Sequence, residues 1–223
     1  MVFRRDFDHR YRVSDWDKFP WLEHGFGTRH SLWPEPHRCA TLKQIHSADS
    51  YVAREAGCCG SGDALLSNEA GLCLSIRTAD CVPIFLVDPV NRAVAAIHAG
   101  WRGTAVAIAA QVVLRMEEEF GTKPYALQAA IGPAIGPCCY EVGPDVAERL
   151  RKLFPERDDL HIQTRIDLSE ANRRQLIDSG VRPQDIAIAG MCTFCMKEDF
   201  HSFRRDRDLA GRLVSTIGIR NEP

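Results

Sequence analysis

The sequence predicts one domain of the α/β (α+β) class over residues 1–223, in which short buried strands alternate with amphipathic helices. Two apolar runs, at 82–87 and 93–97, are short, rich in Val and Ile, and separated by an Asp-Pro-Val-Asn turn, which is typical of buried strands. Residues 104–121 have the apolar spacing of a helix instead. With 223 residues, of which 45% are hydrophobic, the chain is long enough to bury a sizeable core.

The remaining elements follow from local signals along the chain. Residues 42–52 alternate loosely between apolar and polar side chains, which predicts a strand, and residues 58–63 read as a glycine-containing loop. Later segments are expected to form strands at 126–131 and 186–189 and helices at 144–154 and 168–179. Pro144 suits the first turn of one helix, and Gly180 ends the other.

The helix that follows the second apolar run has a signal at each end. Thr104 is a suitable N-cap, and Gly121 follows the last turn. Apolar side chains share one stripe, which consists of Val106, Ala109, Ala110, Val113 and Leu114. Unpaired N–H groups at such a helix start could hold an anion, although an ordinary surface helix would have the same signals.

Charge and composition exclude several classes of protein. The formal net charge is −2, so no basic field attracts the chain to nucleic acid or to a membrane. No apolar run approaches the ~20 residues of a transmembrane helix, and the first residues lack the apolar core of a signal peptide. The nine cysteines are therefore expected to be reduced in a cytoplasmic protein, and their odd number argues against a complete disulfide framework.

Three side chains from separate segments are candidates for a reactive centre. Cys81 precedes the first apolar run and His98 follows the second, so a hairpin would bring a thiol and an imidazole to one sheet edge. His46, in the strand expected at 42–52, is the third candidate.

These three residues permit more than one chemistry. Cys81 could be a nucleophile activated by a histidine, as in cysteine hydrolases and deamidases. A thiolate and two imidazoles also suit zinc, because three protein ligands leave a fourth position open. Copper is a further possibility, since it binds the same ligands more strongly. The spacing of the residues does not separate these alternatives.

Two later segments carry weaker signals. Cys192 and Cys195 form a CxxC pair, but a zinc ribbon needs a second pair at similar spacing, which the sequence lacks. We therefore expect reduced structural thiols at 138, 139, 192 and 195, with a redox pair or a metal site as alternatives. Arg204 and Arg205 follow a serine and could bind phosphate, or could form a solvated basic run neutralised by nearby aspartates.

A series of motifs resembles the laccase-domain family, whose members are described as polyphenol oxidases and as purine nucleoside phosphorylases. The resemblance spans roughly residues 24–212. Its motifs are Gln44-Ile45-His46, Thr78-Ala79-Asp80-Cys81-Val82-Pro83, His98-Ala99-Gly100-Trp101-Arg102-Gly103, Ile131-Gly132-Pro133, Tyr140-Glu141-Val142-Gly143, Cys192-Thr193-Phe194-Cys195 and Ser202-Phe203-Arg204-Arg205-Asp206.

The resemblance implies a fold, a metal and an activity. It implies a single domain with layered mixed β-sheets flanked by helices, and zinc at His46, Cys81 and His98. The implied activities are phosphorolysis of adenosine, inosine and methylthioadenosine, and deamination of adenosine. Copper-dependent oxidation of phenols is claimed for some members. Phosphorolysis needs an anion behind the ribose, and this role falls to Arg102, to the helix start at 104, or to Arg204 and Arg205.

The chain also departs from the family pattern. The segment at 28–43 is short and lacks an Asn-Leu-Gly element, and Ser47 stands where glycine is common, so one pocket wall and the substrate preference differ. A multicopper oxidase needs several copper centres with many histidines, and the chain has only eight histidines. A binding module with zinc as a structural staple is the alternative without catalysis.

Overall fold

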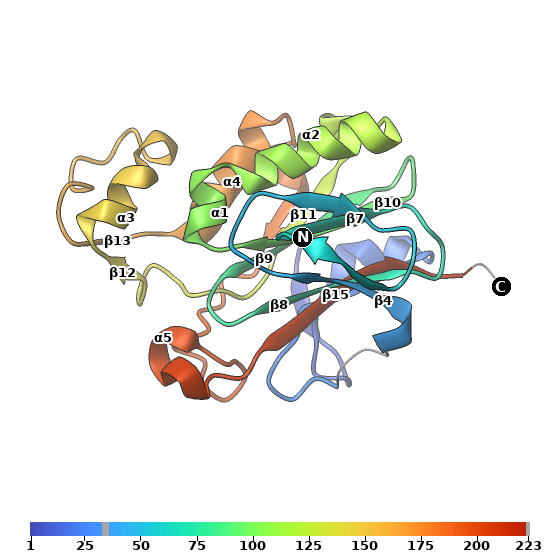
Figure 1. Cartoon of the computed structure of the whole chain (residues 1–223), viewed down its shortest axis with the longest axis horizontal. Helices are drawn as coiled ribbons and strands as arrows, with labels where there is room; N and C mark the ends of the chain where they lie inside the picture. The colour runs from blue at the N-terminus through green and yellow to red at the C-terminus, as the bar shows by residue number, and fades with distance from the viewer. Residues whose placement is uncertain (33–35, 222–223) are drawn as a thin grey trace.

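The computed structural model describes residues 1–32 and 36–221, which form three layers (Figure 1). A six-stranded sheet lies in the middle, a five-stranded sheet packs against one of its faces, and helices cover the other face. The prediction of a mixed α/β fold with layered sheets is confirmed. Residues 33–35 of the short 28–43 segment lie outside the described residues.

The middle sheet has the strand order β14-β11-β9-β10-β7-β5. In that order its strands are Ile186–Ile188, Gln128–Ile131, Val82–Asp88, Ala93–Ala99, Ala64–Ser67 and Ser50–Val52. The second sheet has the order β3-β15-β8-β4-β6, with strands Leu22–Gly25, Leu213–Ile219, Cys73–Thr78, Cys39–Lys43 and Gly57–Ser61. Two short pairs are β1 (Phe3–Arg5) with β2 (Tyr11–Val13), and β12 (Glu141–Val142) with β13 (Thr164–Arg165).

The helices are short, apart from two that cover the middle sheet. They are α1 (Trp101–Ala105), α2 (Ile108–Phe120), α3 (Pro144–Arg149), α4 (Leu168–Asp178) and α5 (Phe203–Asp206). Single 3-10 turns lie at Ser14–Lys18, Pro36–Arg38, Pro124–Ala126, Arg151–Leu153, Pro183–Asp185 and Arg207–Leu209. In the described part of the chain, no helix combines the length and the apolar character needed to cross a membrane.

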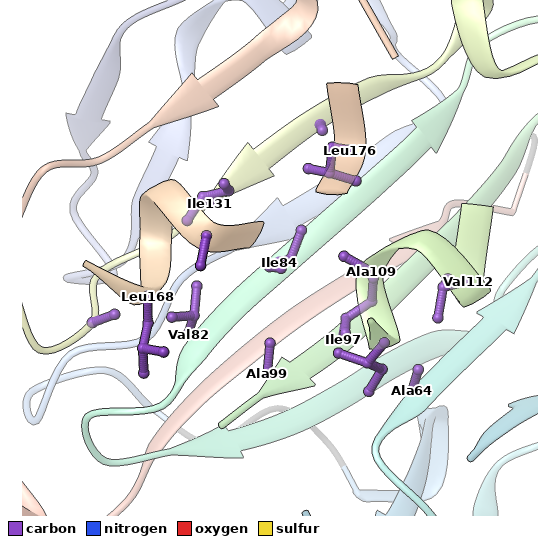
Figure 2. Close-up of a cluster of buried hydrophobic side chains, with 14 of the residues drawn as sticks. Ala64, Val82, Ile84, Ile97, Ala99, Ala109, Val112, Ile131, Leu168 and Leu176 are labelled. Atoms are coloured by element: carbon purple, nitrogen blue, oxygen red, sulfur yellow. The ribbon is translucent and has the colours of Figure 1, made fainter. Parts of the chain in front are cut away.

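Strands β9 and β10 form the predicted hairpin at the centre of the middle sheet. Every residue of both strands is buried, because the sheet is covered on both faces. In β9, Val82, Ile84 and Leu86 join the core under the helices, whereas Phe85 and Val87 join the core between the two sheets. Figure 2 shows the first core, where α2 and α4 pack side chains onto β9, β10 and β11. Apolar side chains on both faces explain why these strands appear as unbroken apolar runs.

The single helix expected at 104–121 is wrong, because the structure has two helices there. Ala107 adopts a left-handed conformation with φ of 61° and separates α1 from α2. Thr104 is buried inside α1, and its hydroxyl accepts a hydrogen bond from Asn172 instead of capping a helix. The break also shifts the apolar stripe, so Val106 and Leu114 are 53% and 55% exposed. The buried residues of α2 are Ile108, Ala109, Val112, Val113 and Met116.

Two other predictions need correction, and the rest hold to within a few residues. Residues 42–52 are not one strand: β4 and β5 belong to different sheets, and the loop between them carries His46. The loop expected at 58–63 is largely replaced by edge strand β6 (Gly57–Ser61), which runs parallel to β4. The helix expected at 144–154 is α3 followed by a 3-10 turn. Elements β11, β14 and α4 lie where they were expected, and Gly121 ends α2 with φ of 70°.

Three strand ends meet at one edge of the middle sheet. Pro83 of β9 is paired with His98 of β10, so Cys81, just before β9, lies beside the end of β10. Ile97 of β10 is paired with Ala64 of β7, which places Asp63, just before β7, against His98. The hairpin therefore brings the thiol and the imidazole to the same edge, as predicted, and adds a carboxylate.

Candidate metal centre

His46, Cys81 and His98 come together at this edge. Their ligand atoms all lie within 4.8 Å of one another. The two imidazole rings are 4.8 Å apart between centroids and inclined by 76°, so they approach the thiol from different directions. His98 is buried, Cys81 is partly exposed, and His46 is exposed on the open side of the centre.

Asp63 fixes the orientation of His98. The Nδ1 atom of His98 donates to Oδ1 of Asp63 at 2.7 Å, and the backbone N–H of His98 donates to the carbonyl of Asp63 at 2.8 Å. Because a carboxylate only accepts hydrogen bonds, Nδ1 carries the proton, and Nε2 of a neutral ring keeps a free lone pair. A metal-binding histidine held through its second nitrogen by a carboxylate is a recurring arrangement in metal sites.

The second oxygen of Asp63 holds the loop that carries His46. Oδ2 accepts from the N–H groups of Ile45 at 3.3 Å and Ser47 at 2.6 Å, and from the hydroxyl of Ser47 at 3.0 Å. These bonds hold His46 in a left-handed conformation with φ of 61°, which an unsupported residue seldom adopts. One carboxylate therefore positions two of the three candidate ligands.

Asp80 does the same for the segment that carries Cys81. Its φ is 84°, and its carboxylate accepts from the hydroxyls of Thr193 at 2.6 Å and Ser202 at 3.1 Å. The same carboxylate accepts from the backbone N–H of Arg204 at 2.6 Å. Asp80 thus joins the thiol-bearing loop to two distant loops of the chain.

Gly100 leaves room for the ligands to approach one another. A Cβ atom at this position would lie 3.0 Å from Cδ2 of His46 and 3.1 Å from Sγ of Cys81. Either contact would push the ring or the sulfur away, so the glycine in this place is explained by close approach rather than by backbone conformation.

The charges in the centre favour a thiolate. Burial raises the pKa of the Cys81 thiol, but His98 and His46 outweigh burial and lower this pKa to about 6. Burial likewise lowers the pKa of His98, but Cys81 and Asp63 raise it to about 9. The thiolate is the form of cysteine that binds metals and attacks electrophiles.

A cavity of about 270 Å³ opens beside the centre, close to the ~300 Å³ at the lower end of small-molecule sites. It combines ligands of the centre, bulky apolar side chains and three arginines. The lining residues are His46, Ala79, Asp80, Cys81, Trp101, Arg102, Ile135, Tyr140, Leu168, Phe203, Arg204 and Arg207.

Two of the predicted anion-binding residues line this cavity, and the others do not. The guanidinium of Arg102 lies 4.4 Å from the ring centroid of Trp101, and that of Arg204 lies 5.1 Å from the ring centroid of Tyr140. Arg205 instead points into the protein, where it donates to three backbone carbonyls and to Asp206. The helix start expected at 104 is also wrong, because this position lies inside α1.

Sequence reasoning missed Asp63, Asp80 and Arg207. Asp63 directly precedes a buried strand that pairs with the strand of His98. An acidic residue at the start of this apolar strand is the signal by which Asp63 could have been identified. Asp80 is part of the motif around Cys81, but its role depends on residues more than a hundred positions away. Arg207 has a positive φ of 50°, which the sequence does not show.

Replacing Asp63 with asparagine should weaken metal binding at this centre by about 10–100-fold, as loss of a carboxylate behind a histidine ligand generally does. The affinity for zinc can be measured by competition with a chromogenic chelator. Asp49→Asn is the matched control, because Asp49 is an exposed carboxylate in the loop that carries His46. A folded Asp63→Asn protein with unchanged zinc affinity would contradict this role.

Comparison with known proteins places the chain in a family. The family described as "Multi-copper polyphenol oxidoreductase laccase" matches residues 28–220. "Purine nucleoside phosphorylase YlmD" of Geobacillus stearothermophilus is 37% identical, over 96% of this chain and 79% of that protein. "Adenosine deaminase RL5", from an unknown prokaryotic organism, is 38% identical, over 70% of this chain and 61% of that protein.

A solved structure supports the same relationship. The crystal structure of YlmD from Geobacillus stearothermophilus superposes with a TM-score of 0.89, at 31% identity, over 99% of both chains. The fold and the matched residues agree with the family resemblance of the sequence. The chain therefore belongs to the laccase family of multi-copper polyphenol oxidoreductases, as its motifs predicted.

Proposed function

We propose that the chain is a zinc-dependent purine nucleoside phosphorylase that also deaminates adenosine. The observation that carries this proposal is a thiolate and two imidazoles, braced by a buried carboxylate, beside a cavity with aromatic and guanidinium groups. The names of two relatives, a purine nucleoside phosphorylase and an adenosine deaminase, support the same substrate class. Adenosine, inosine and methylthioadenosine are the proposed nucleosides.

The donor set of the centre fits zinc. His46, Cys81 and His98 supply three ligand atoms of the types that zinc prefers, within 4.8 Å of one another. Bound there, zinc would keep one position open and lower the pKa of a coordinated water to ~7. Cys81 is readily deprotonated, and Asp63 keeps one proton of His98 on Nδ1. Because the pKa of His98 is raised to about 9, metal binding through Nε2 would release the second proton of this ring.

The cavity can hold both parts of a phosphorolysis reaction. Trp101, Tyr140 and Phe203 offer flat apolar surfaces for a purine ring, and Arg102 and Arg204 offer positive charge for phosphate. A phosphate oxygen would form the new bond to the ribose C1′ while the bond from C1′ to the base nitrogen breaks. The base leaves with the proton that hydrogen phosphate gives up. In deamination, water oxygen replaces the amino group on the purine ring and ammonia leaves.

One alternative is copper-dependent oxidation of phenols, which the family description suggests. In the described part of the chain, only one group of clustered ligand atoms contains histidine. Multicopper oxidases use several copper centres with many histidines, so the geometry favours one metal ion at a histidine-containing centre and a reaction without a chain of electron carriers.

The other alternative is a cysteine hydrolase, and one observation favours it. Cys81, His98 and Asp63 follow one another as nucleophile, base and orienting carboxylate do in cysteine and serine hydrolases. A hydrolase of this kind would give His46 no catalytic role, whereas a zinc centre uses His46, Cys81 and His98 as ligands.

Replacing any one of His46, Cys81 or His98 with alanine should remove zinc from this centre and abolish both activities together, because each supplies one of three ligands. Zinc per chain is measured by elemental analysis, and free hypoxanthine from inosine is measured with and without phosphate. A variant that keeps full zinc but loses turnover, or a covalent substrate adduct on Cys81, would support the hydrolase instead.

Arg102→Ala and Arg204→Ala should each raise the KM for phosphate by roughly tenfold or more, because a charged hydrogen bond typically contributes about 1.5–3 kcal/mol. Initial rates of hypoxanthine release at varied phosphate concentration give this constant. Arg54→Ala is the matched control, since the Arg54 side chain is 72% exposed and does not line the cavity. An unchanged phosphate KM in both cavity variants would remove these arginines from the anion site.

A further inference from the structure

Four cysteines that are far apart in the sequence meet on the surface beside the nucleoside cavity. They are Cys138, Cys139, Cys192 and Cys195, and their sulfur atoms all lie within 4.8 Å of one another. Sγ of Cys195 is 3.7 Å from Sγ of Cys138 and 3.4 Å from Sγ of Cys139. All four are free thiols, and none belongs to the centre of His46, Cys81 and His98.

The sheet brings the two pairs together. β11 and β14 are parallel neighbours, so the loops that follow them leave the same edge. The first loop turns back at Gly136 and carries Cys138 and Cys139, and the second carries Cys192 and Cys195. A short bridge between Ala134 and Cys192 keeps the loops in register. Cys138 and Cys139 thus supply the second pair of cysteines that a zinc site needs beside the CxxC motif.

We propose that these four cysteines bind a second zinc ion as a structural tetrathiolate site. Zinc with Zn–S bonds of ~2.3 Å places the sulfurs of a regular tetrahedron about 3.8 Å apart. The observed separations of 3.4 and 3.7 Å are close to that value. They are far longer than the ~2.05 Å of a disulfide bond.

The turn at Gly136 fits closely around the sulfurs. The backbone N–H of Gly136 donates to Sγ of Cys192 at 3.2 Å. A Cβ atom at Gly136 would lie 3.2 Å from Cβ of Cys192 and 3.3 Å from Sγ of Cys138, so only glycine fits without displacing the sulfurs.

Arg205 holds the CxxC turn in place. Its guanidinium donates to the carbonyls of Thr193 and Phe194, the two residues between the cysteines of the CxxC turn. The guanidinium is also paired with Asp206, so Arg205 acts here by positioning the turn.

The site would act as a staple for one wall of the cavity. Tyr140, which lines the cavity, directly follows Cys139, and Thr193 donates to Asp80 next to Cys81. The four cysteines do not line the cavity, so their metal takes no part in the chemical step. Its loss should loosen both loops, lower thermal stability and weaken substrate binding more than it slows turnover.

Elemental analysis of the full chain, purified in zinc-containing buffer without a metal-binding tag, is the first test. Wild type should hold two zinc ions per chain. Cys138→Ser/Cys195→Ser should hold one, Cys81→Ala should hold one, and the triple variant should hold none. Cys58→Ser/Cys59→Ser is the matched control, because it removes another adjacent pair outside the cluster and should hold two.

Thiol labelling of the wild-type protein tests the site without any substitution. Cys138 and Cys195 are exposed, yet zinc should protect them from maleimide, and a chelator should restore their labelling. Exposed Cys58 should react in both states. Cobalt substituted for zinc in Cys81→Ala should give the strong visible absorption of a tetrahedral tetrathiolate.

Three results would overturn the proposal. The first is equal zinc content in wild type and Cys138→Ser/Cys195→Ser. The second is maleimide labelling of Cys138 and Cys195 that is the same with and without zinc. The third is a disulfide within the cluster, found by peptide mapping. None of these depends on the centre at Cys81. Conversely, a Cys81→Ala protein with unchanged zinc content would reject the first centre and leave the second intact.

Discussion

The site depends on one buried carboxylate. Asp63 has no exposed surface, and removing a charged group from water costs several kcal/mol unless hydrogen bonds replace its hydration. Its Oδ1 accepts a hydrogen bond from Nδ1 of His98, and its Oδ2 accepts hydrogen bonds from Ile45 and Ser47. The cost of burial is offset only while both partners stay in place. The carboxylate of Asp63 therefore couples the position of the His98 imidazole to the conformation of the loop that carries His46.

The rest of the fold makes this arrangement rigid. The hairpin of β9 and β10 is buried by helices on one face and by the second sheet on the other, so the ends that carry Cys81 and His98 have little freedom. His46 and Asp80 adopt left-handed conformations at the site, where such conformations persist only with support from their surroundings. Asp63 supports the first and the bonds of Asp80 support the second. Elements far apart in the chain thus keep the ligand atoms close.

The sequence predicts what depends on local pattern. Apolar runs identify β9 and β10, and the turn between them places Cys81 and His98 at the same end of the hairpin. Local pattern could not show the break at Ala107, because alanine usually continues a helix and here the packing of α1 on α4 overrides that preference. Nor could it find the partners of Asp63, or show that Cys138 and Cys139 meet a CxxC turn. These contacts join residues 16 to 57 positions apart, and only the sheet order brings them together.

Anomalous diffraction at the zinc absorption edge would locate a metal ion in the centre that Asp63 organises. Crystals of the full chain grown with zinc should show a peak within about 2.0–2.3 Å of Sγ of Cys81 and of one nitrogen each of His46 and His98. Nδ1 of His98 should remain bonded to Asp63. The absence of a peak between these residues, or a peak bound to Nδ1 of His98 with Asp63 displaced, would contradict the account.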